Sequence, residues 1–446
     1  MDKKIKIAEL LIPAGDMEKL EVAFAYGADA VYAGVPAFSL RTREIGFRAN
    51  SIEAAINRSH ELGKKIYLAM NIYAHNLKLN AFIEEMERVA DLKPDAFILT
   101  DPGLIQEAVK RFPHIPVHLS TQSNTTNWLT VKFWRDLGVK RIILSRELQL
   151  TEIKKMHEEV PDIELEAFVH GAICIAYSGR CLISNYLNHR DANQGTCTNS
   201  CRWEYKLAYE KGSILEVEKQ QNPIKDEEYI APEKDYFLKE AYRPNDKFPI
   251  TEDEFGTFLM NSKDLCSIEL LSEILDSGVI SLKAEGRTKS AYYAAMVSRS
   301  YRKSLDDYYA GKDFDPQNLR DLMALSSRTY TSGFYTRNPR QYGENYDDGF
   351  SASHTHRVVA TLKGYDSEKK LARILVKNRI LPGMKVDVLM PKETRRIIIN
   401  DIFDKYNNKK EAAHGGAGEV FIPLDFNPGT HAFFREEINE LKVESL

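Results

Sequence analysis

The sequence lacks any apolar run that approaches the roughly 20 residues needed to span a bilayer as a helix. Its first residues, MDKKIKIAELLIPAGDMEKLEVA, contain neither the apolar core of a secretory signal nor a small-residue cleavage site. These two absences predict a cytoplasmic protein without a membrane partner, in which thiols stay reduced.

Cysteine is scarce, and most of the cysteines lie in one short segment. The chain has five cysteines in 446 residues, and none occurs in the first 173. Four of them fall within 28 residues, at Cys174, Cys181, Cys197 and Cys201. In a reducing compartment, clustered cysteines more often bind a metal than form disulfides. The window therefore predicts a metal or cluster site, with a disulfide staple or a cysteine nucleophile as the alternatives.

The chain has no excess of positive charge. Its formal net charge is −4 at pH 7, so a nucleic-acid surface would have to be local. One local bias exists, because the segment from Arg357 to Lys410 has fourteen Lys and Arg residues against six Asp and Glu. The bias fits either the solvated outer face of a small domain or a surface that contacts RNA phosphates.

The common hydrolase motifs are also missing. The sequences HELGK at His60 and HEEVP at His157 lack the second histidine of a zinc-binding H-E-x-x-H helix, and no G-x-S-x-G turn follows a strand. His170 precedes Cys174 by four residues and could form a Cys–His pair, although a supporting polar role is the preferred interpretation. Cys266 is predicted to begin a helix and to fill a core position.

What the sequence does contain is a repeated alternation of short apolar runs with amphipathic stretches. The apolar runs predict strands at 8–14, 29–35, 65–71, 95–101, 115–122, 140–147, 163–171 and 279–287. Nearly continuous apolar runs are typical of strands that are buried on both faces of a parallel sheet. Eight such repeats predict an α/β fold of the (β/α)8 TIM-like barrel type. A doubly wound open sheet is the alternative, but no Gly-rich phosphate fingerprint follows the first strand.

The same pattern divides the chain into parts. We expect a catalytic barrel over 1–310, with a cysteine-containing insertion at 171–278 after the seventh strand. An irregular linker is expected at 311–353, and a small antiparallel β-barrel that is a candidate RNA-binding domain at 354–446. Active sites of such barrels lie at the carboxyl ends of the strands. The polar residues expected there are Asn71, Asp101, Gln122, Asn124, Arg146, Glu147, Glu285 and Arg287.

The spacing of the four cysteines restricts what they could hold. It is C-x6-C, then fifteen residues, then C-x3-C, and the first pair is too loose for a zinc knuckle. The radical-enzyme motif C-x3-C-x2-C is absent, because Glu204 stands where its last cysteine would be. Four thiolates on an irregular loop suit a [4Fe–4S] cluster. Zinc and uncoordinated thiols stay open as alternatives.

The segment EAFVHGAICIAYSGRCLIS resembles the signature of the collagenase-like peptidase U32 family. The matching positions are Glu166, Phe168, Gly171, Ala172, Ile173, Cys174, Gly179, Cys181, Ile183 and Ser184. The segments NQGTCTNSCRWEY, FGTFLMNSKDL, SLKAEGRTKS and YTSGF further resemble the tRNA hydroxylation branch of that family.

This resemblance implies an iron–sulfur enzyme that converts the wobble uridine of tRNA to 5-hydroxyuridine without molecular oxygen, with prephenate as oxygen donor. It places Cys174, Cys181, Cys197 and Cys201 at the positions of the cluster thiols. The anticodon loop of tRNA would then be a partner, and the electron donor is open. The alternatives are a peptidase that uses a cysteine or a bound metal, and a tRNA-binding adaptor without chemistry.

These expectations assign provisional roles. Catalytic roles are predicted for His170, Glu285 and Arg287, and substrate-binding roles for Asn71, Gln122, Arg146 and Glu147. Arg146, Arg287 and His170 are the predicted grip on a carboxylated donor, because guanidinium groups bind carboxylates through paired hydrogen bonds. The target base would be splayed out of its loop into the barrel mouth.

Overall fold

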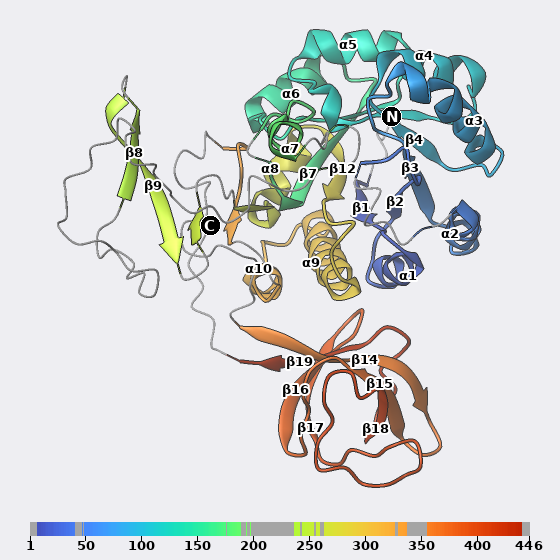
Figure 1. The fold of residues 1–446 in the computed structure, drawn as a ribbon, viewed down its shortest axis with the longest axis vertical. Helices are drawn as coiled ribbons and strands as arrows, with labels where there is room; N and C mark the ends of the chain where they lie inside the picture. The colour runs from blue at the N-terminus through green and yellow to red at the C-terminus, as the bar shows by residue number, and fades with distance from the viewer. Residues whose placement is uncertain are drawn as a thin grey trace.

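The structure is a computed structural model with two folded parts, a barrel and a C-terminal sheet (Figure 1). It describes residues 7–40, 47, 49–174, 176–188, 193, 197, 236–240, 243–253, 256–258, 263–325, 329–336 and 355–438. No helix in these ranges is both long enough and apolar enough to cross a membrane.

Eight parallel strands form a closed barrel. They are β1 (Glu9–Pro13), β2 (Ala30–Gly34), β3 (Lys65–Ala69), β4 (Ala96–Leu99), β5 (Val117–Leu119), β6 (Arg141–Ile143), β7 (Glu164–Ala172) and β12 (Val279–Ala284). Each strand pairs with the next, and β12 pairs with both β7 and β1, which closes the sheet. The predicted (β/α)8 barrel and all eight of its strands are thereby confirmed.

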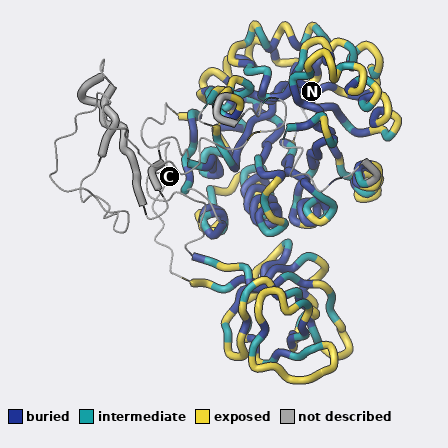
Figure 2. The backbone as a smooth tube through the Cα atoms, in the orientation of Figure 1, coloured by how far each residue is buried: buried dark blue, intermediate teal, exposed yellow. Residues whose placement is uncertain are grey.

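Helices surround the barrel on its outer side (Figure 1). They are α1 (Met17–Ala25), α2 (Ala49–Glu61), α3 (Leu79–Ala90), α4 (Pro102–Arg111), α5 (Trp128–Asp136), α6 (Leu150–Glu159), α8 (Leu271–Asp276) and α9 (Ala291–Tyr309). Side chains cap the starts of α1, α4, α5 and α9; the Asp101 side chain, for example, accepts hydrogen bonds from the first backbone N–H groups of α4. Figure 2 shows that the helices bury the side that faces the barrel and expose the other.

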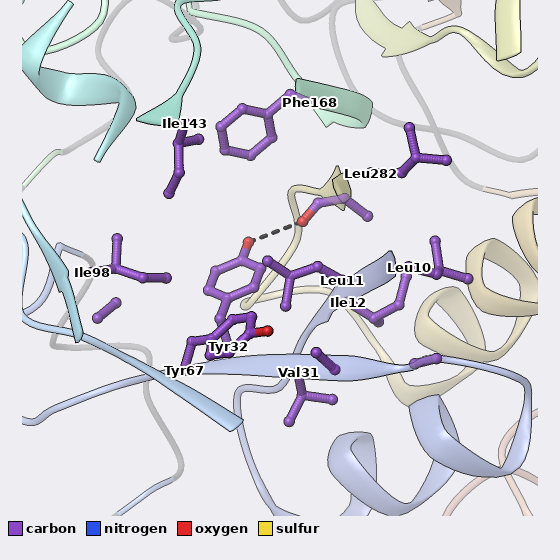
Figure 3. Close-up of a cluster of buried hydrophobic side chains, with 14 of the residues drawn as sticks. Leu10, Leu11, Ile12, Val31, Tyr32, Tyr67, Ile98, Ile143, Phe168 and Leu282 are labelled. Atoms are coloured by element: carbon purple, nitrogen blue, oxygen red, sulfur yellow. Dashed lines mark hydrogen bonds between the residues drawn. The ribbon is translucent and has the colours of Figure 1, made fainter. Parts of the chain in front are cut away.

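The barrel interior is filled by side chains rather than by solvent. Tyr32, Ile98, Ile143 and Phe168 converge on the centre of the barrel, whereas Val31 and Leu282 point toward the helices (Figure 3). The Tyr32 hydroxyl donates a hydrogen bond of 3.0 Å to the backbone oxygen of Ala284, which is the dashed line in Figure 3. This period-two alternation determines which residues reach the barrel axis.

The insertion follows β7, as expected. Within it lie α7 (Ile183–Asn188) and an antiparallel sheet of β8 (Tyr236–Glu240), β9 (Arg243–Asp253) and β10 (Gly256–Phe258). Much of the segment 206–256 within this insertion lies outside the described residues. The insertion ends in β11 (Asp264–Cys266), which pairs antiparallel with β7 and parallel with β13 (Tyr330–Thr331).

Two local expectations were wrong. Cys266 does not begin a helix but ends β11, because the far end of β7 offers an edge to which this segment adds; its burial in the core is confirmed. Part of the predicted irregular linker is helical, since α10 spans Pro316–Met323. Asp315 caps this helix and Pro316 occupies its first turn, which is a recognised start signal.

The C-terminal part is a six-stranded antiparallel sheet in the order β17-β16-β19-β14-β15-β18. Its strands are β14 (His356–Asp366), β15 (Leu371–Val376), β16 (Met384–Leu389), β17 (Thr394–Ile399), β18 (Glu419–Pro423) and β19 (Phe433–Glu437). Buried and exposed residues alternate along β15, so one face forms a separate apolar core. The predicted small antiparallel β-domain is confirmed.

Direct contacts hold this sheet against the barrel helices, beneath α1, α9 and α10 in Figure 1. The buried Tyr26 hydroxyl donates to the backbone oxygens of Leu389 and His431. Arg299 donates to the backbone oxygen of Met390 and forms an ion pair of 2.9 Å with Asp321 of α10. The sheet is therefore a docked domain rather than a tethered one.

Candidate active site at the mouth of the barrel

A cavity of about 170 Å³ opens at the carboxyl ends of the barrel strands. Its floor is formed by inward-facing residues of β2, β4, β6, β7 and β12, and its upper wall by the cysteine segment after β7. Three of the four clustered cysteines line it, namely Cys174, Cys181 and Cys197. The cysteine window and the predicted barrel mouth are thus parts of one site.

Within the described residues, Cys174, Cys181 and Cys197 form no disulfide, and all three are at least partly accessible. Cys174 and Cys197 are exposed and Cys181 is partly exposed, and the Ser184 hydroxyl donates to the Cys197 sulfur at 3.7 Å. Cys201 lies outside the described residues. In the described part of the chain, no three His, Cys, Asp or Glu side chains are gathered closely enough to hold a metal ion. Soft sulfur donors on one wall nevertheless fit iron–sulfur or zinc chemistry by ligand type.

Glycines of the U32 signature explain how the cysteine segment is held. Gly179 has a φ of +70°, and a Cβ atom on it would lie 2.2 Å from the backbone oxygen of Gln122. Gly171 has a φ of +102°, and a Cβ atom there would lie 2.4 Å from the backbone oxygen of Glu285. Only glycine permits both close approaches. The segment is therefore pressed against the barrel mouth at two points.

Two predicted amide side chains line the cavity in fixed orientations. Asn71 accepts a hydrogen bond from the Leu40 N–H and donates to the Ser120 hydroxyl. The Gln122 side-chain oxygen accepts a hydrogen bond of 3.4 Å from the Thr100 hydroxyl. Both side chains are at least nine-tenths buried, so they present defined polar edges to a ligand.

Predicted charged residues meet at the rim. Arg146 donates to the backbone oxygen of Ala172 at 2.8 Å, stacks 4.0 Å from the Phe168 ring centroid and lies 3.9 Å from the Glu285 carboxylate. Arg287 is buried and donates to the backbone oxygen of Leu40. Arg146, Glu285 and Arg287 all line the cavity. The rim thus presents two guanidinium groups and one carboxylate.

His170 does not line the cavity, in contrast to its predicted catalytic role. The pairing of β7 with β12 shifts register after Phe168, and this bulge turns His170 away from the barrel axis. Its ring packs among Tyr293, Tyr301 and Tyr330, and neither ring nitrogen has a hydrogen-bond partner among the described residues. Burial lowers the pKa of His170 to about 3. A neutral, enclosed imidazole cannot grip a carboxylate in the cavity.

Three further predicted mouth residues have supporting positions. Glu147 lies off the cavity and accepts a hydrogen bond from the Ser178 N–H, which fastens the cysteine segment. Asn124 accepts from the Ser145 hydroxyl, and Asp101 caps α4. These contacts assign the three residues to the framework of the site rather than to substrate binding.

Sequence reasoning missed a buried charge network below the cavity. Glu166 is fully buried and accepts hydrogen bonds from Lys283 at 2.8 Å, Ser281 at 3.0 Å and Arg141 at 3.1 Å. Arg141 also pairs with Glu9 at 2.6 Å. Burial by itself would raise the pKa of Glu166, but Lys283 and Arg141 lower it overall, so the carboxylate is ionised.

Lys283 belongs to both the network and the cavity. Burial lowers the pKa of Lys283 from its ordinary value, although the adjacent Glu166 carboxylate opposes the shift. The signal was present in the sequence VISLKAEGR, where alternation places Ser281, Lys283 and Glu285 on the inward face of the last barrel strand.

Two sequence-family models match the chain. The sequence model of Peptidase family U32 matches residues 15–345, and that of the Peptidase family U32 C-terminal domain matches residues 354–434. The chain belongs to peptidase family U32. The signature segment of this U32 chain forms β7 and the cysteine wall, so the features that define the family also build the cavity.

Relatives with names extend the comparison. The U32 chain is 44% identical over 449 residues to the tRNA hydroxylation protein P of Haemophilus influenzae, covering 97% of this chain and 96% of that protein. It is 44% identical over 425 residues to the Escherichia coli protein of the same name, covering 93% of each. An E. coli 23S rRNA 5-hydroxycytidine synthase is 31% identical over 298 residues, covering 67% of this chain and 39% of that protein. The resemblance to the tRNA hydroxylation branch is confirmed.

Proposed function

We propose that this U32 chain is a tRNA-modifying enzyme that hydroxylates the wobble uridine at C5, giving 5-hydroxyuridine without molecular oxygen. The observation that carries the proposal is its 44% identity, over nearly the full length of both chains, to a protein named tRNA hydroxylation protein P. The relative named as a 5-hydroxycytidine synthase supports hydroxylation of a pyrimidine ring as the shared chemistry.

The cavity supports this proposal because it suits a single flipped base. An enzyme that reacts at a base must take that base out of its stack into a pocket. Tyr32 and Phe168 supply aromatic surface at the floor, and the amides of Asn71 and Gln122 supply hydrogen-bonding edges. The anticodon loop, whose bases are already single-stranded, is the part of a tRNA that loses least on such a rearrangement.

We propose that a [4Fe–4S] cluster is the cofactor. Cys174, Cys181 and Cys197 would hold it together with Cys201, for which the structure gives no position. Such a cluster supplies electron transfer or, with one open iron, Lewis-acid chemistry. The protein's own contribution is to orient the base and to exclude competing water.

The oxygen donor in this proposal is a small carboxylate such as prephenate. Arg146 and Arg287 are the residues proposed to bind it, because both guanidinium groups line the cavity near its rim. His170 is removed from the predicted grip because its ring is enclosed by tyrosines outside the cavity. The electron donor is left open.

The peptidase alternative gains no support from the cavity. A cysteine peptidase needs a histidine within hydrogen-bond reach of its nucleophile. Cys174, Cys181 and Cys197 line the cavity, whereas His170, the predicted base, does not. In the described residues, no histidine lines the cavity.

The test is nucleoside analysis combined with metal analysis. The gene would be deleted in its host and restored with wild-type protein or with Cys174→Ala, and bulk tRNA would be digested and analysed by mass spectrometry. We expect 5-hydroxyuridine derivatives to disappear on deletion, to return with the wild type and to stay absent with the variant. Protein purified without air should contain about four iron and four sulfide ions per chain. Unchanged tRNA nucleosides after deletion would overturn the proposal, and zinc without sulfide would overturn its cofactor.

A further inference from the structure

We infer that Lys283 is the residue that selects the base: its ammonium group donates a hydrogen bond to a carbonyl oxygen of uracil and thereby disfavours cytosine. The inference rests on the proposed function, and it assigns a role to a residue on the last barrel strand rather than to the cysteine wall. Four steps support it.

The first step is position. Lys283 pairs with Phe168 on β7 and with Leu11 on β1, so its side chain projects along the barrel axis into the cavity floor. The Nζ atom lies 4.2 Å from the Tyr32 ring centroid and 5.7 Å from that of Phe168. Ile98 and Ile143 complete the floor (Figure 3). A flat ring with one polar edge is the ligand that fits an aromatic and aliphatic floor with one cation.

The second step is charge. Glu166 accepts a hydrogen bond from Lys283 at 2.8 Å, and Arg141 and Ser281 hold Glu166 in turn. The charge of Lys283 is therefore already balanced. A free carboxylate placed there would be repelled by the Glu166 charge, whereas a neutral carbonyl group carries no net charge and can still accept a hydrogen bond from the ammonium group. This balance favours a base over a carboxylate at the floor.

The third step is hydrogen-bonding capacity. An ammonium group has three N–H donors and no acceptor. Among the described residues, Glu166 is the acceptor recorded for Nζ, so donors are left for a ligand. Gln122 adds to the same polarity, because its side-chain oxygen accepts from Thr100 and its amide N–H groups are left to face the cavity. Lys283 and Gln122 are both donors toward the ligand.

The fourth step is discrimination. At the position where uracil and thymine present the O4 acceptor, cytosine presents an amino donor. A cytosine amino group facing Lys283 would leave two buried donors without an acceptor, which is unfavourable. The hydrogen-bond donors of Lys283 and Gln122 at the cavity floor therefore match the O4 carbonyl acceptor of uracil.

The test measures base preference in the full-length protein. Two hairpin RNAs with the sequence of a tRNA anticodon arm would differ only by U or C at the wobble position, and dissociation constants would be compared by fluorescence anisotropy. We expect the wild type to bind the U hairpin about tenfold more tightly than the C hairpin. The variant is Glu166→Gln with Lys283→Met, because removing both charges avoids an unpaired buried carboxylate. In that variant the ratio should fall to near one.

The matched control is Ser281→Ala. It removes a hydrogen bond to Glu166 in the same network but does not line the cavity, so it should keep the wild-type ratio. Thermal unfolding of each protein would show that it is folded.

A folded double variant that keeps the tenfold ratio, or a wild type without preference, would overturn the inference and leave the proposed hydroxylation intact. Unchanged tRNA nucleosides after deletion of the gene would instead overturn the proposed function.

Discussion

Gly179 lies against the backbone of Gln122 so closely that a Cβ atom on the glycine would come within 2.2 Å of the Gln122 oxygen. The two residues belong to different parts of the site, since Gly179 is in the cysteine segment and Gln122 follows β5. Their contact fixes the height of the thiols above the cavity floor. It also gives a physical reason for a glycine that the sequence presented only as a motif position.

Gly179→Ala should therefore displace the cysteine segment and abolish or strongly reduce tRNA modification. The matched control is Gly63→Ala, because Gly63 has a similar φ of +64° but nothing within 4 Å of its added Cβ atom. Left-handed strain alone costs about 1 kcal/mol in both variants. Free energies of unfolding and nucleoside analysis of each variant would separate the contact from the strain. Equal activity of the two variants would contradict the role given to this contact.

Arg141→Met should destabilise the barrel strongly. Arg141 is buried and pairs with Glu9, Glu164 and Glu166, so its removal leaves buried carboxylates unbalanced. Breaking a buried ion network in this way costs about 3–5 kcal/mol. The control is Arg135→Met, which breaks ion pairs to Asp136 and Asp162 at the surface and should cost about 1 kcal/mol or less. Urea unfolding followed by fluorescence measures both, and similar losses would contradict the buried network as a source of stability.

Because His170 is buried, the free energy of unfolding should depend on pH. Burial lowers the pKa of His170 from 6.5 to about 3 in the folded chain, whereas the unfolded chain keeps the ordinary value. Between these values the unfolded state binds a proton that the folded state does not, so the free energy of unfolding falls as the pH falls. One such group contributes about 1.4 kcal/mol per pH unit. The loss begins near pH 6.5 and ends near pH 3.

His170→Phe should remove this contribution, because a phenyl ring fits among Tyr293, Tyr301 and Tyr330 and cannot titrate. Urea unfolding would be measured at several values between pH 7 and pH 4. As the pH falls, the free energy of unfolding should fall less in the variant than in the wild type. The same substitution should leave tRNA modification intact, since His170 does not line the cavity. Parallel pH curves for the two proteins would contradict the buried neutral histidine.

The fold was largely predictable because buried parallel strands carry a strong sequence signal. The eight apolar runs gave the eight barrel strands with boundaries that differ by a few residues. Cys266 was misplaced because its strand exists only through pairing with β7, which is a tertiary contact that local patterning does not contain. The helix at Pro316–Met323 falls within the predicted irregular linker, although Asp315 and Pro316 form a recognised start signal.

The site was predictable only in part. Asn71, Gln122, Arg146, Glu285 and Arg287 line the cavity because the carboxyl ends of parallel strands meet at one mouth. His170 occupies an equivalent position in the sequence, yet a bulge between β7 and β12 turns it outward, and nothing in the sequence marks that bulge. Lys283 was not predicted, although period-two alternation along the last strand puts it on the same face as Ser281, because an apolar run by itself identifies only the strand.

The C-terminal domain carries the last prediction, which concerns RNA affinity. Lys377, Arg379 and Lys405 are exposed, and the described residues place no carboxylate within ion-pair distance of them. Cations that have no carboxylate partner are available to replace counterions on a phosphate backbone. Replacing all three with Gln should weaken tRNA binding and reduce the slope of log Kd against log salt by about two to three.

The control for this triple variant replaces Lys110 and Lys154, which are exposed on α4 and α6, with Gln. These helices lie on the barrel. If the C-terminal domain supplies the phosphate contacts, replacing the two lysines should leave the slope of log Kd against log salt within about 0.5 of the wild-type value. Filter binding of total tRNA across a range of salt concentrations measures both slopes. Equal slopes for the two variants would mean that the basic bias of 357–410 is a solvated surface, and RNA would then have to contact the protein elsewhere. A selective change in the triple variant would make the C-terminal domain the element that holds the tRNA body while the barrel acts on its base.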